Sequence, residues 1–150
     1  MQSPHLYFVD VPEAVLVMEF IRGERLKDLI PSAPIEETAA LFELLGRKIA
    51  KLHAAGITHG DLTTANILKR DGGLVFVDFG LSLHSARLED HAVDLRLAKE
   101  TLVGAHSEVS SLALESLTSG YSAESGANRA RAVMKQLRSI ERRGRYARLG

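Results

Sequence analysis

Two short segments carry side chains that could do chemistry: residues 59–66, His-Gly-Asp-Leu-Thr-Thr-Ala-Asn, and residues 78–80, Asp-Phe-Gly. Phosphoryl transfer from ATP needs one group that orients the attacking oxygen, and oxygen ligands that hold Mg²⁺ against the phosphates. Asp61, Asn66 and Asp78 are of the right types for these tasks. The pattern therefore indicates phosphoryl transfer, against the alternative that these polar residues only satisfy turns.

The spacing of these residues resembles that of a known fold. The five-residue step from Asp61 to Asn66 is similar to the catalytic loop of protein kinases, and an Asp-Phe-Gly that follows a hairpin is similar to their metal-binding motif. The resemblance implies that Asp61 is the catalytic aspartate and that Asn66 and Asp78 hold Mg²⁺ and, with it, ATP. We expect His59 to brace the loop backbone, and the other histidines show no spacing typical of a metal site.

An apolar stretch ahead of these motifs, residues 15–21, is followed by Arg-Gly. It resembles the last strand of a kinase N-lobe and the hinge that meets adenine. Backbone groups make the contacts at such a hinge, so Glu19 and Ile21 are implicated in nucleotide binding through their peptide N–H and C=O. The assignment depends on the downstream motifs, because any apolar strand that ends in a turn looks similar.

The elements that must position these residues can be predicted from hydrophobic spacing. Apolar and β-branched residues predict strands at 6–9 and 14–20. Spacings of 4, 4 and 3 place four apolar residues on one face of a helix over residues 35–55, which Ser32 could cap and Gly56 could end. These four residues are Leu41, Leu45, Ile49 and Leu52.

The second half of the chain reads as one small hairpin and three helices. Two apolar runs, residues 67–69 and 74–78, are joined by Arg-Asp-Gly-Gly, which predicts a hairpin. Helical spacing follows over residues 90–103, 108–117 and 127–142. Loops are expected at residues 31–34 and in the Ser- and Gly-rich stretch 119–126. The fold class is therefore α+β, mainly helical with a minor β component.

Composition limits the class of protein. The 150 residues are 45% hydrophobic and 25% charged, as is typical of one soluble domain, and they include no cysteine. The longest aliphatic run, residues 14–18, is far short of the roughly 20 residues that span a bilayer, and no export signal is recognisable. We therefore expect a soluble cytoplasmic protein without membrane contact.

The net charge of zero hides an asymmetry. Residues 129–150 carry eight Lys or Arg and one acid, so the preceding residues are acidic overall. The first four of these cations could be the solvated face of a helix. The last four lack an apolar period and are expected to form a flexible end that contacts RNA phosphates. These four are Arg142, Arg143, Arg145 and Arg148.

Several positions depart from an ordinary protein kinase. Gly60 stands where most kinases carry an Arg that receives an activation-loop phosphate, and Thr63 stands where a Lys usually steadies the transferred phosphate. The segment from 81 to 89 is too short for a loop that docks a peptide. A peptide substrate is therefore poorly provided for.

Four segments together resemble the small atypical kinase of the KEOPS complex, the PRPK family: residues 59–66, 78–82, 89–95 (Glu-Asp-His-Ala-Val-Asp-Leu) and 142–148 (Arg-Arg-Gly-Arg-Tyr-Ala-Arg). The resemblance implies a serine/threonine kinase and ATPase that uses ATP and Mg²⁺ and supports the N6-threonylcarbamoyl modification of adenosine 37 in tRNA. It implies as partners a threonylcarbamoyl-transferase subunit, a small KEOPS subunit and tRNA. It also implies that Asp94 anchors the catalytic loop.

Only 60 residues precede Asp61, and no Gly-x-Gly-x-x-Gly motif is present. The chain is thus expected to be a kinase-like C-terminal lobe with its N-lobe mostly absent: residues 1–21 as a remnant of N-lobe strands and hinge, 22–141 as the C-lobe, and 142–150 as a basic tail. Two other functions stay open. One is a non-catalytic module that docks a partner and tRNA, and the other is a small-molecule phosphotransferase of the aminoglycoside or choline type.

Overall fold

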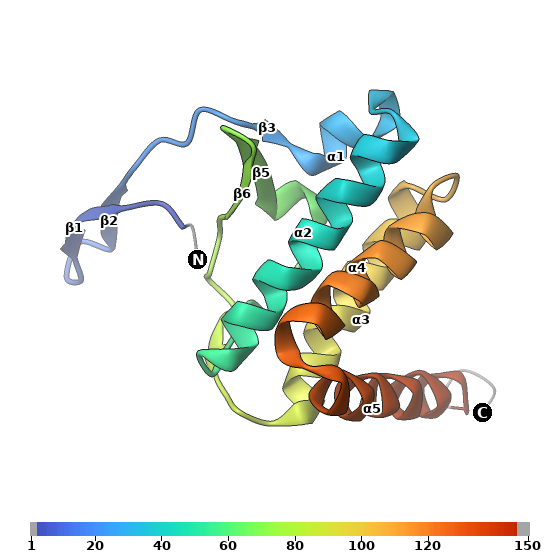
Figure 1. Ribbon diagram of the computed structural model, residues 1–150. Helices are drawn as coiled ribbons and strands as arrows, with labels where there is room; N and C mark the ends of the chain where they lie inside the picture. The colour runs from blue at the N-terminus through green and yellow to red at the C-terminus, as the bar shows by residue number, and fades with distance from the viewer. Residues whose placement is uncertain (1–2, 147–150) are drawn as a thin grey trace.

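The computed structural model describes the backbone of residues 3–146 and the side chains of residues 3–144. Over this part of the chain, five α-helices and three small antiparallel sheets form an α+β fold, as the sequence predicts (Figure 1). Among the described helices, none combines the length and apolar character that a membrane crossing requires.

The helices are α1 (Leu26–Leu29), α2 (Ile35–Ala54), α3 (Leu88–Ala105), α4 (Ser110–Ser125) and α5 (Ala127–Tyr146), with 3-10 turns η1 (Ile30–Ser32) and η2 (Thr64–Asn66). The strands are β1 (Leu6–Asp10), β2 (Val15–Met18), β3 (Glu24–Arg25), β4 (Ile57–Thr58), β5 (Ile67–Arg70), β6 (Gly73–Phe76) and β7 (Leu83–His84). They pair as β1-β2, β3-β5-β6 and β4-β7.

Helix α2 confirms the expected helix over residues 35–55 to within one residue at its end. Its four apolar residues of the predicted face are all buried. Gly56 follows the helix with a φ of +72°, a left-handed conformation that glycine adopts without strain. The expectation that Ser32 caps the helix is wrong, because its hydroxyl donates to the Leu29 carbonyl (3.2 Å) and Pro34 occupies the cap position.

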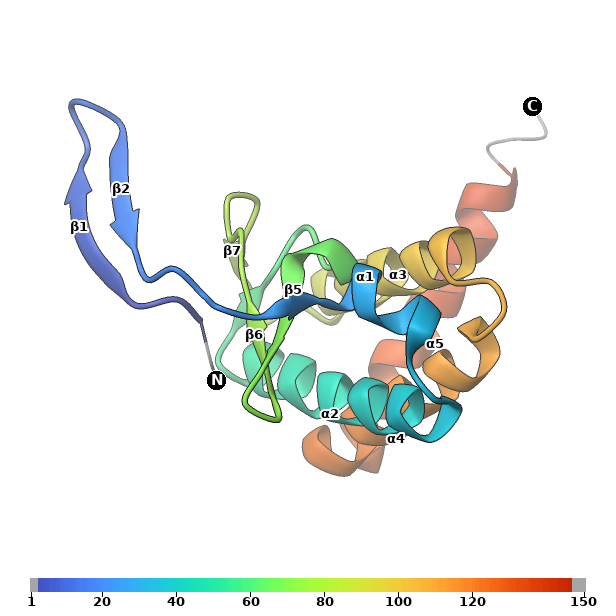
Figure 2. The same cartoon turned by 90° about the horizontal axis from the view of Figure 1, so that it is seen from above.

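Helices α2 and α4 lie side by side and form the centre of the core (Figures 1 and 2). A Cβ added at Gly46 would lie 2.0 Å from the Leu117 carbonyl oxygen, and one at Gly120 would lie 1.9 Å from that of Glu43. The two glycines therefore allow the backbones to approach closely. This contact explains why residues 119–125 are helical and not the expected loop: packing on α2 offsets the low helix propensity of Ser and Gly.

Strands β5 and β6 confirm the expected hairpin, with Ile67 opposite Phe76 and Arg70 opposite Gly73. The connection is two residues long, not four. Asp71 and Gly72 both have positive φ, 49° and 74°, as a type I′ turn requires. This turn fixes the pairing register of β5 and β6, the two strands that connect the 59–66 loop to the Asp-Phe-Gly segment.

The three later helices are confirmed, and each is longer than predicted. The flexible end expected from residue 142 is wrong as far as Tyr146, because α5 continues to that residue. Two ion pairs hold its last turns against α3: Lys99 with Glu141 (2.6 Å) and Glu89 with Arg143 (2.9 Å). The short β4-β7 pair was not predicted, since strands of two residues have no readable period.

The two expected N-terminal strands are confirmed as the β1–β2 hairpin, in which Asp10 lies opposite Val15 and Leu6 opposite Met18. The hairpin extends away from the helical body in both views (Figures 1 and 2). Its apolar side chains are exposed on both faces, for example Phe8 at 54%. The division of the chain at residue 21 into N-lobe and C-lobe parts stays a prediction.

Candidate active site

The 59–66 loop leaves β4 and ends in the 3-10 turn η2, where Asn66 faces back toward Asp61. The Asn66 side-chain amide donates to the Asp61 carbonyl oxygen (3.0 Å) and to Asp61 Oδ2 (2.8 Å). Both amide hydrogens are thus used within the loop. Within the described part of the chain, the Asn66 Oδ1 and the second oxygen of the Asp61 carboxylate have no hydrogen-bond partner and are left for other contacts.

Asp78 lies next to this loop because the backbone joins the two segments. The Val77 N–H donates to the Asn66 carbonyl (3.0 Å), just beyond the end of β6. Asp78 itself has a φ of +62°, unusual for a residue with a side chain, and its carboxylate accepts the Gly80 N–H (3.3 Å). The side chain is exposed. The strained conformation therefore holds a solvent-facing carboxylate beside Asn66.

His59 ties the same two segments together through its ring. Its Nε2–H donates to the Val77 carbonyl (3.1 Å), and its Nδ1 accepts the Asp61 N–H (3.4 Å). Both bonds need a neutral ring with its proton on Nε2, and burial lowers the pKa of His59 in agreement with that form. The ring also packs on Phe79, with centroids 4.8 Å apart. His59 thus has the bracing role expected from the sequence.

The buried Asp94 of α3 anchors the loop from below. Its two carboxylate oxygens accept the peptide N–H groups of His59 (2.7 Å) and Gly60 (2.8 Å). Burial by itself would raise the pKa of the Asp94 carboxyl, but the hydrogen bonds that it accepts, the strongest from His53, hold this pKa below its ordinary value. This is the anchoring contact that the resemblance implies for Asp94.

Gly60 is required where the loop approaches the segment after Asp-Phe-Gly. Its φ is +82°, and an added Cβ would lie 2.1 Å from the Leu81 carbonyl oxygen. A side chain at this position, including the Arg of ordinary protein kinases, would collide with that backbone. The departure at position 60 therefore has a steric cause.

A cavity of about 590 Å³ lies between the β1–β2 hairpin and the Asp-Phe-Gly segment. Asp78, Phe79 and Gly80 line one side, and Leu16 and Met18 of β2 line the other. The lining is mostly apolar with a carboxylate at one edge, as suits a nucleotide whose base is buried and whose phosphates reach a metal. Sequence reasoning missed Leu16 and Met18, although their alternation along β2 places them on one face.

The two residues assigned to the hinge differ in their surroundings. Glu19 donates its N–H to the His5 carbonyl (2.7 Å), so this peptide N–H is not available to a base. The Glu19 carboxylate pairs with Arg70 (2.6 Å). Ile21 is buried. Contact of adenine with the Glu19 carbonyl and the Ile21 peptide stays a prediction.

The donor set near Asp78 suits Mg²⁺. Asn66 Oδ1 and the Asp78 carboxylate are hard oxygen ligands, and Mg²⁺ commonly takes only one or two protein ligands because water and phosphate supply the others. Within residues 3–144, no group of three or more His, Cys, Asp or Glu side chains is arranged to hold a metal on its own. Asn66 and Asp78 would therefore supply only part of the oxygen ligands of such an ion.

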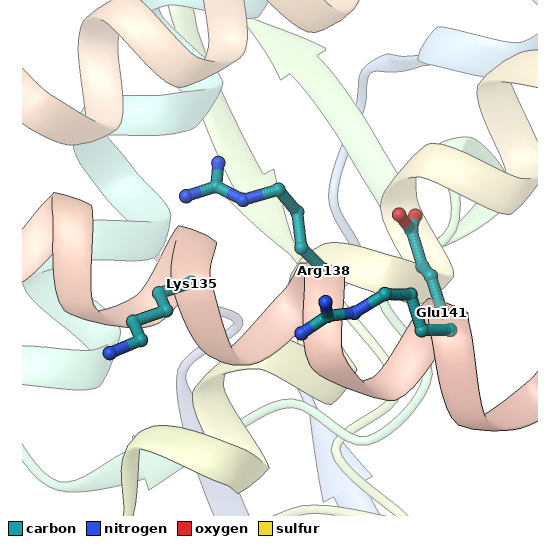
Figure 3. A pocket seen from close by; sticks show the side chains of 4 residues that line it. Lys135, Arg138 and Glu141 are labelled. Carbon is teal, nitrogen blue, oxygen red and sulfur yellow. The ribbon is translucent and has the colours of Figure 1, made fainter.

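A basic surface lies on α5, away from the loop. Lys135, Arg138 and Arg142 line a shallow pocket of about 350 Å³ together with Glu141 (Figure 3). We call these three cations the α5 basic face. Arg143 is paired with Glu89 instead. Of the other predicted RNA contacts, Arg148 and the side chain of Arg145 lie outside the described residues.

Comparison with known proteins gives a family match. A family model described as "RIO domain" matches residues 5–95, which include both the 59–66 loop and the Asp-Phe-Gly segment. Asp94 lies within the matched residues as well.

Three relatives illustrate the similarity. The chain is 41% identical to the "KEOPS complex subunit Bud32" of Pyrococcus abyssi over 95% of this chain and 65% of that protein. It is 36% identical to the "Probable serine/threonine-protein kinase BUD32 homolog" of Archaeoglobus fulgidus over 92% of this chain and 65% of that protein. It is 38% identical to a "Probable bifunctional tRNA threonylcarbamoyladenosine biosynthesis protein" of Methanobrevibacter smithii over 96% of this chain and 25% of that protein. The chain thus spans 65% of the length of the first two relatives.

Proposed function

The chain belongs to the RIO domain family, in its Bud32 branch, and on that premise we propose that it binds Mg²⁺-ATP and cleaves the bond to the γ-phosphate. The acceptor is water in an ATPase reaction or a serine or threonine hydroxyl in a kinase reaction. The observation that carries the proposal is the position of Asn66. Its side-chain amide donates to the Asp61 carboxylate, and its carbonyl accepts the N–H of Val77, the residue before Asp78.

The residues of the loop and its neighbours have separate roles in this proposal. Asn66 binds one oxygen of the Asp61 carboxylate, which leaves the other oxygen to orient the attacking hydroxyl or water. Asn66 Oδ1 and Asp78 would hold Mg²⁺, which supplies positive charge against the phosphate oxygens when it is bound. His59 and Asp94 fix the loop at 2.7–3.4 Å distances to its peptide groups, so the reacting groups are aligned before substrate arrives.

The cavity beneath the β1–β2 hairpin is the proposed place of the adenine and ribose. Leu16, Met18 and Ile57 offer apolar contact from two sides, and Asp78 lies at the edge toward the metal. We further propose that the Glu19 carbonyl and the Ile21 peptide contact the base at the open end of β2.

The names of the relatives suggest the biological setting. Two of them are described as KEOPS or Bud32 proteins and one as a tRNA threonylcarbamoyladenosine biosynthesis protein. We propose that this chain supports the same tRNA modification, beside a threonylcarbamoyl-transferase subunit and a small KEOPS subunit. The α5 basic face would contact RNA phosphates, since three cations on one helix face suit a charged backbone.

Titration calorimetry of Mg²⁺-ATP with the full chain tests the metal role. The Asp78→Asn variant keeps the size of the side chain but removes its charge. We expect its binding to be at least about tenfold weaker, equivalent to about 1.4 kcal/mol, and to lose its dependence on Mg²⁺.

Asp71→Asn is the matched control, because Asp71 lies in the hairpin that precedes Asp78 and also has a left-handed backbone, but its carboxylate is 93% exposed. This variant should bind like the wild type. Equal affinities of the Asp78→Asn variant and the wild type would overturn the proposed metal site.

A further inference from the structure

A cluster of buried polar side chains lies where α2, α3, α4 and α5 meet, beneath the 59–66 loop. It consists of His53, His91, Asp94, Tyr121 and Arg129, and we call it the polar cluster. His53 and His91 stack with their centroids 4.2 Å apart and their planes within 5° of parallel. Except for Arg129, which is partly buried, every member is at most 1% exposed. The loop anchor Asp94 is thus one of several interdependent groups.

The hydrogen bonds of His91 define its protonation. Its Nε2 lies 3.0 Å from the Ser85 carbonyl, which can only accept, so Nε2 carries a proton. Its Nδ1 lies 3.2 Å from Arg129 Nη2, which can only donate, so Nδ1 carries none. His91 is therefore neutral, and the guanidinium of Arg129 excludes a second proton.

His53 connects this ring to the anchor. Its Nε2–H donates to Asp94 Oδ2 (3.1 Å), and its Nδ1 lies 2.9 Å from the Tyr121 hydroxyl. Burial raises the pKa of Tyr121 to about 12, so that hydroxyl keeps its proton. The neutral His91 ring, stacked at 4.2 Å, adds no charge beside His53.

Arg129 is held by few polar contacts. Among the described residues, no carboxylate forms an ion pair with it, and its buried Nε has no hydrogen-bond partner. A guanidinium held in this way carries a desolvation penalty that another residue would avoid. Within the cluster its guanidinium contacts His91 Nδ1 and also lies near the Tyr121 hydroxyl, whose pKa it lowers against the effect of burial.

We propose that Arg129 is a positioning residue of the active site, which keeps the stacked His91 neutral so that Asp94 holds the peptide groups of His59 and Gly60. Without Arg129, His91 can gain a proton at Nδ1. A cationic His91 is attracted to Asp94 and competes with the loop for that carboxylate. The catalytic consequence rests on the proposed function, whereas the protonation of His91 does not.

The titratable and charged groups that act on His91 are His53 from α2, Asp94 from α3 itself and Arg129 from α5, while Tyr121 of α4 packs on His53. Burial, then His53 and then Arg129 lower the pKa of His91, whereas the hydrogen bond to the Ser85 carbonyl and the Asp94 carboxylate raise it. Removal of Arg129 takes away one lowering group and leaves the opposing carboxylate. The pKa of His91 should therefore rise in such a variant.

The test measures kcat and KM of ATP hydrolysis from about pH 6 to about pH 8 for the full chain and its Arg129→Met variant. We expect kcat of the variant to be about tenfold lower near pH 6 and to approach the wild type near pH 8. A tenfold loss is at the low end of what removal of an outer supporting residue costs. KM should not change, because Arg129 does not touch the nucleotide cavity. Arg129→Lys keeps the cation and should restore part of the activity at low pH.

Arg131→Met is the matched control, since Arg131 lies two residues away on the exposed side of α5. Nitrogen-15 spectra of the His91 ring give a second readout, with a neutral ring near pH 6 in the wild type and a cationic ring in Arg129→Met. The inference is overturned if Arg129→Met and Arg131→Met share one pH profile and one His91 spectrum. If the wild type hydrolyses no ATP, the proposed function fails, and the ring spectra and the His59 and Gly60 amide shifts still decide the inference.

Discussion

The two sides of the candidate site are built in opposite ways. On the helical side, the 59–66 loop is hydrogen bonded to Asp94, which is 1% exposed and belongs to the polar cluster. On the other side, the β1–β2 hairpin leaves apolar side chains such as Tyr7 (65%) and Leu16 (52%) exposed. Alignment of the proposed reacting groups is therefore a property of the helical body, whereas the cover over the proposed nucleotide cavity belongs to a segment with few buried contacts and low local stability.

The largest effect on the helical side of the site is expected from a substitution at Asp94. An Asp94→Asn variant keeps the shape of the side chain, but its amide nitrogen cannot accept the second loop N–H. We expect the free energy of unfolding to fall by about 3 kcal/mol, because a buried loop N–H loses its acceptor and His53 loses a charged hydrogen-bond acceptor. Urea unfolding measures this loss.

Asp71→Asn again serves as the control, and its free energy of unfolding should stay within about 0.5 kcal/mol of the wild type. A similar small change for Asp94→Asn would show that the loop is held by other contacts. Hydrogen exchange of the His59 and Gly60 amides would then locate the remaining support.

A smaller effect is expected at the contact between α2 and α4. Gly120→Ala inserts a Cβ that would lie 1.9 Å from the Glu43 carbonyl oxygen, so the helices must separate. We expect thermal or urea unfolding to give a loss of about 1–3 kcal/mol.

Gly104→Ala is the matched variant in α3, where nothing lies within 4 Å of an added Cβ. It should stabilise the protein by about 0.5–1 kcal/mol, because alanine has the higher helix propensity. Equal effects of the two substitutions would mean that α2 and α4 are not held at the close distance described.

The smallest effect is expected on the hairpin side, and it concerns binding more than folding. Leu16→Ala removes an apolar contact of the cavity, so we expect Mg²⁺-ATP affinity to fall roughly fivefold, or about 1 kcal/mol. The free energy of unfolding should hardly change, since the side chain is half exposed.

Val17→Ala is its control, because Val17 has similar exposure but is not part of the cavity lining. If both variants bind nucleotide equally well, the cavity under the hairpin is not the nucleotide site. A large loss of stability in either variant would contradict the contrast between the two sides.

Local patterns predicted much of the fold. The apolar period of α2 and the Asp-Gly turn of the β5–β6 hairpin depend on neighbours within a few residues, so the sequence alone indicates them. Predictions failed where a distant contact overrides a local preference. The Ser- and Gly-rich residues 119–125 are helical because Gly120 packs on α2, and residues 142–146 are helical where Arg143 pairs with Glu89.

The candidate site, like the fold, could be predicted from the sequence only in part. The five-residue step between Asp61 and Asn66 predicted that these two side chains lie together, since a tight loop brings such neighbours into contact. Their roles in catalysis and metal binding stay proposals. Nothing in the spacing predicted that His91 and Arg129 support the same loop, because 38 residues separate them.

The sequence by itself determined which residues could do chemistry and which segments fold into helices and the hairpin, because both follow from residue type and short-range spacing. Only the tertiary structure decided which polar side chains are buried together. Those partners come from four helices, and a buried polar group is stable only when packing brings it a complementary donor or acceptor. The protonation of His91 and the anchoring of the loop by Asp94 are therefore properties of the folded molecule.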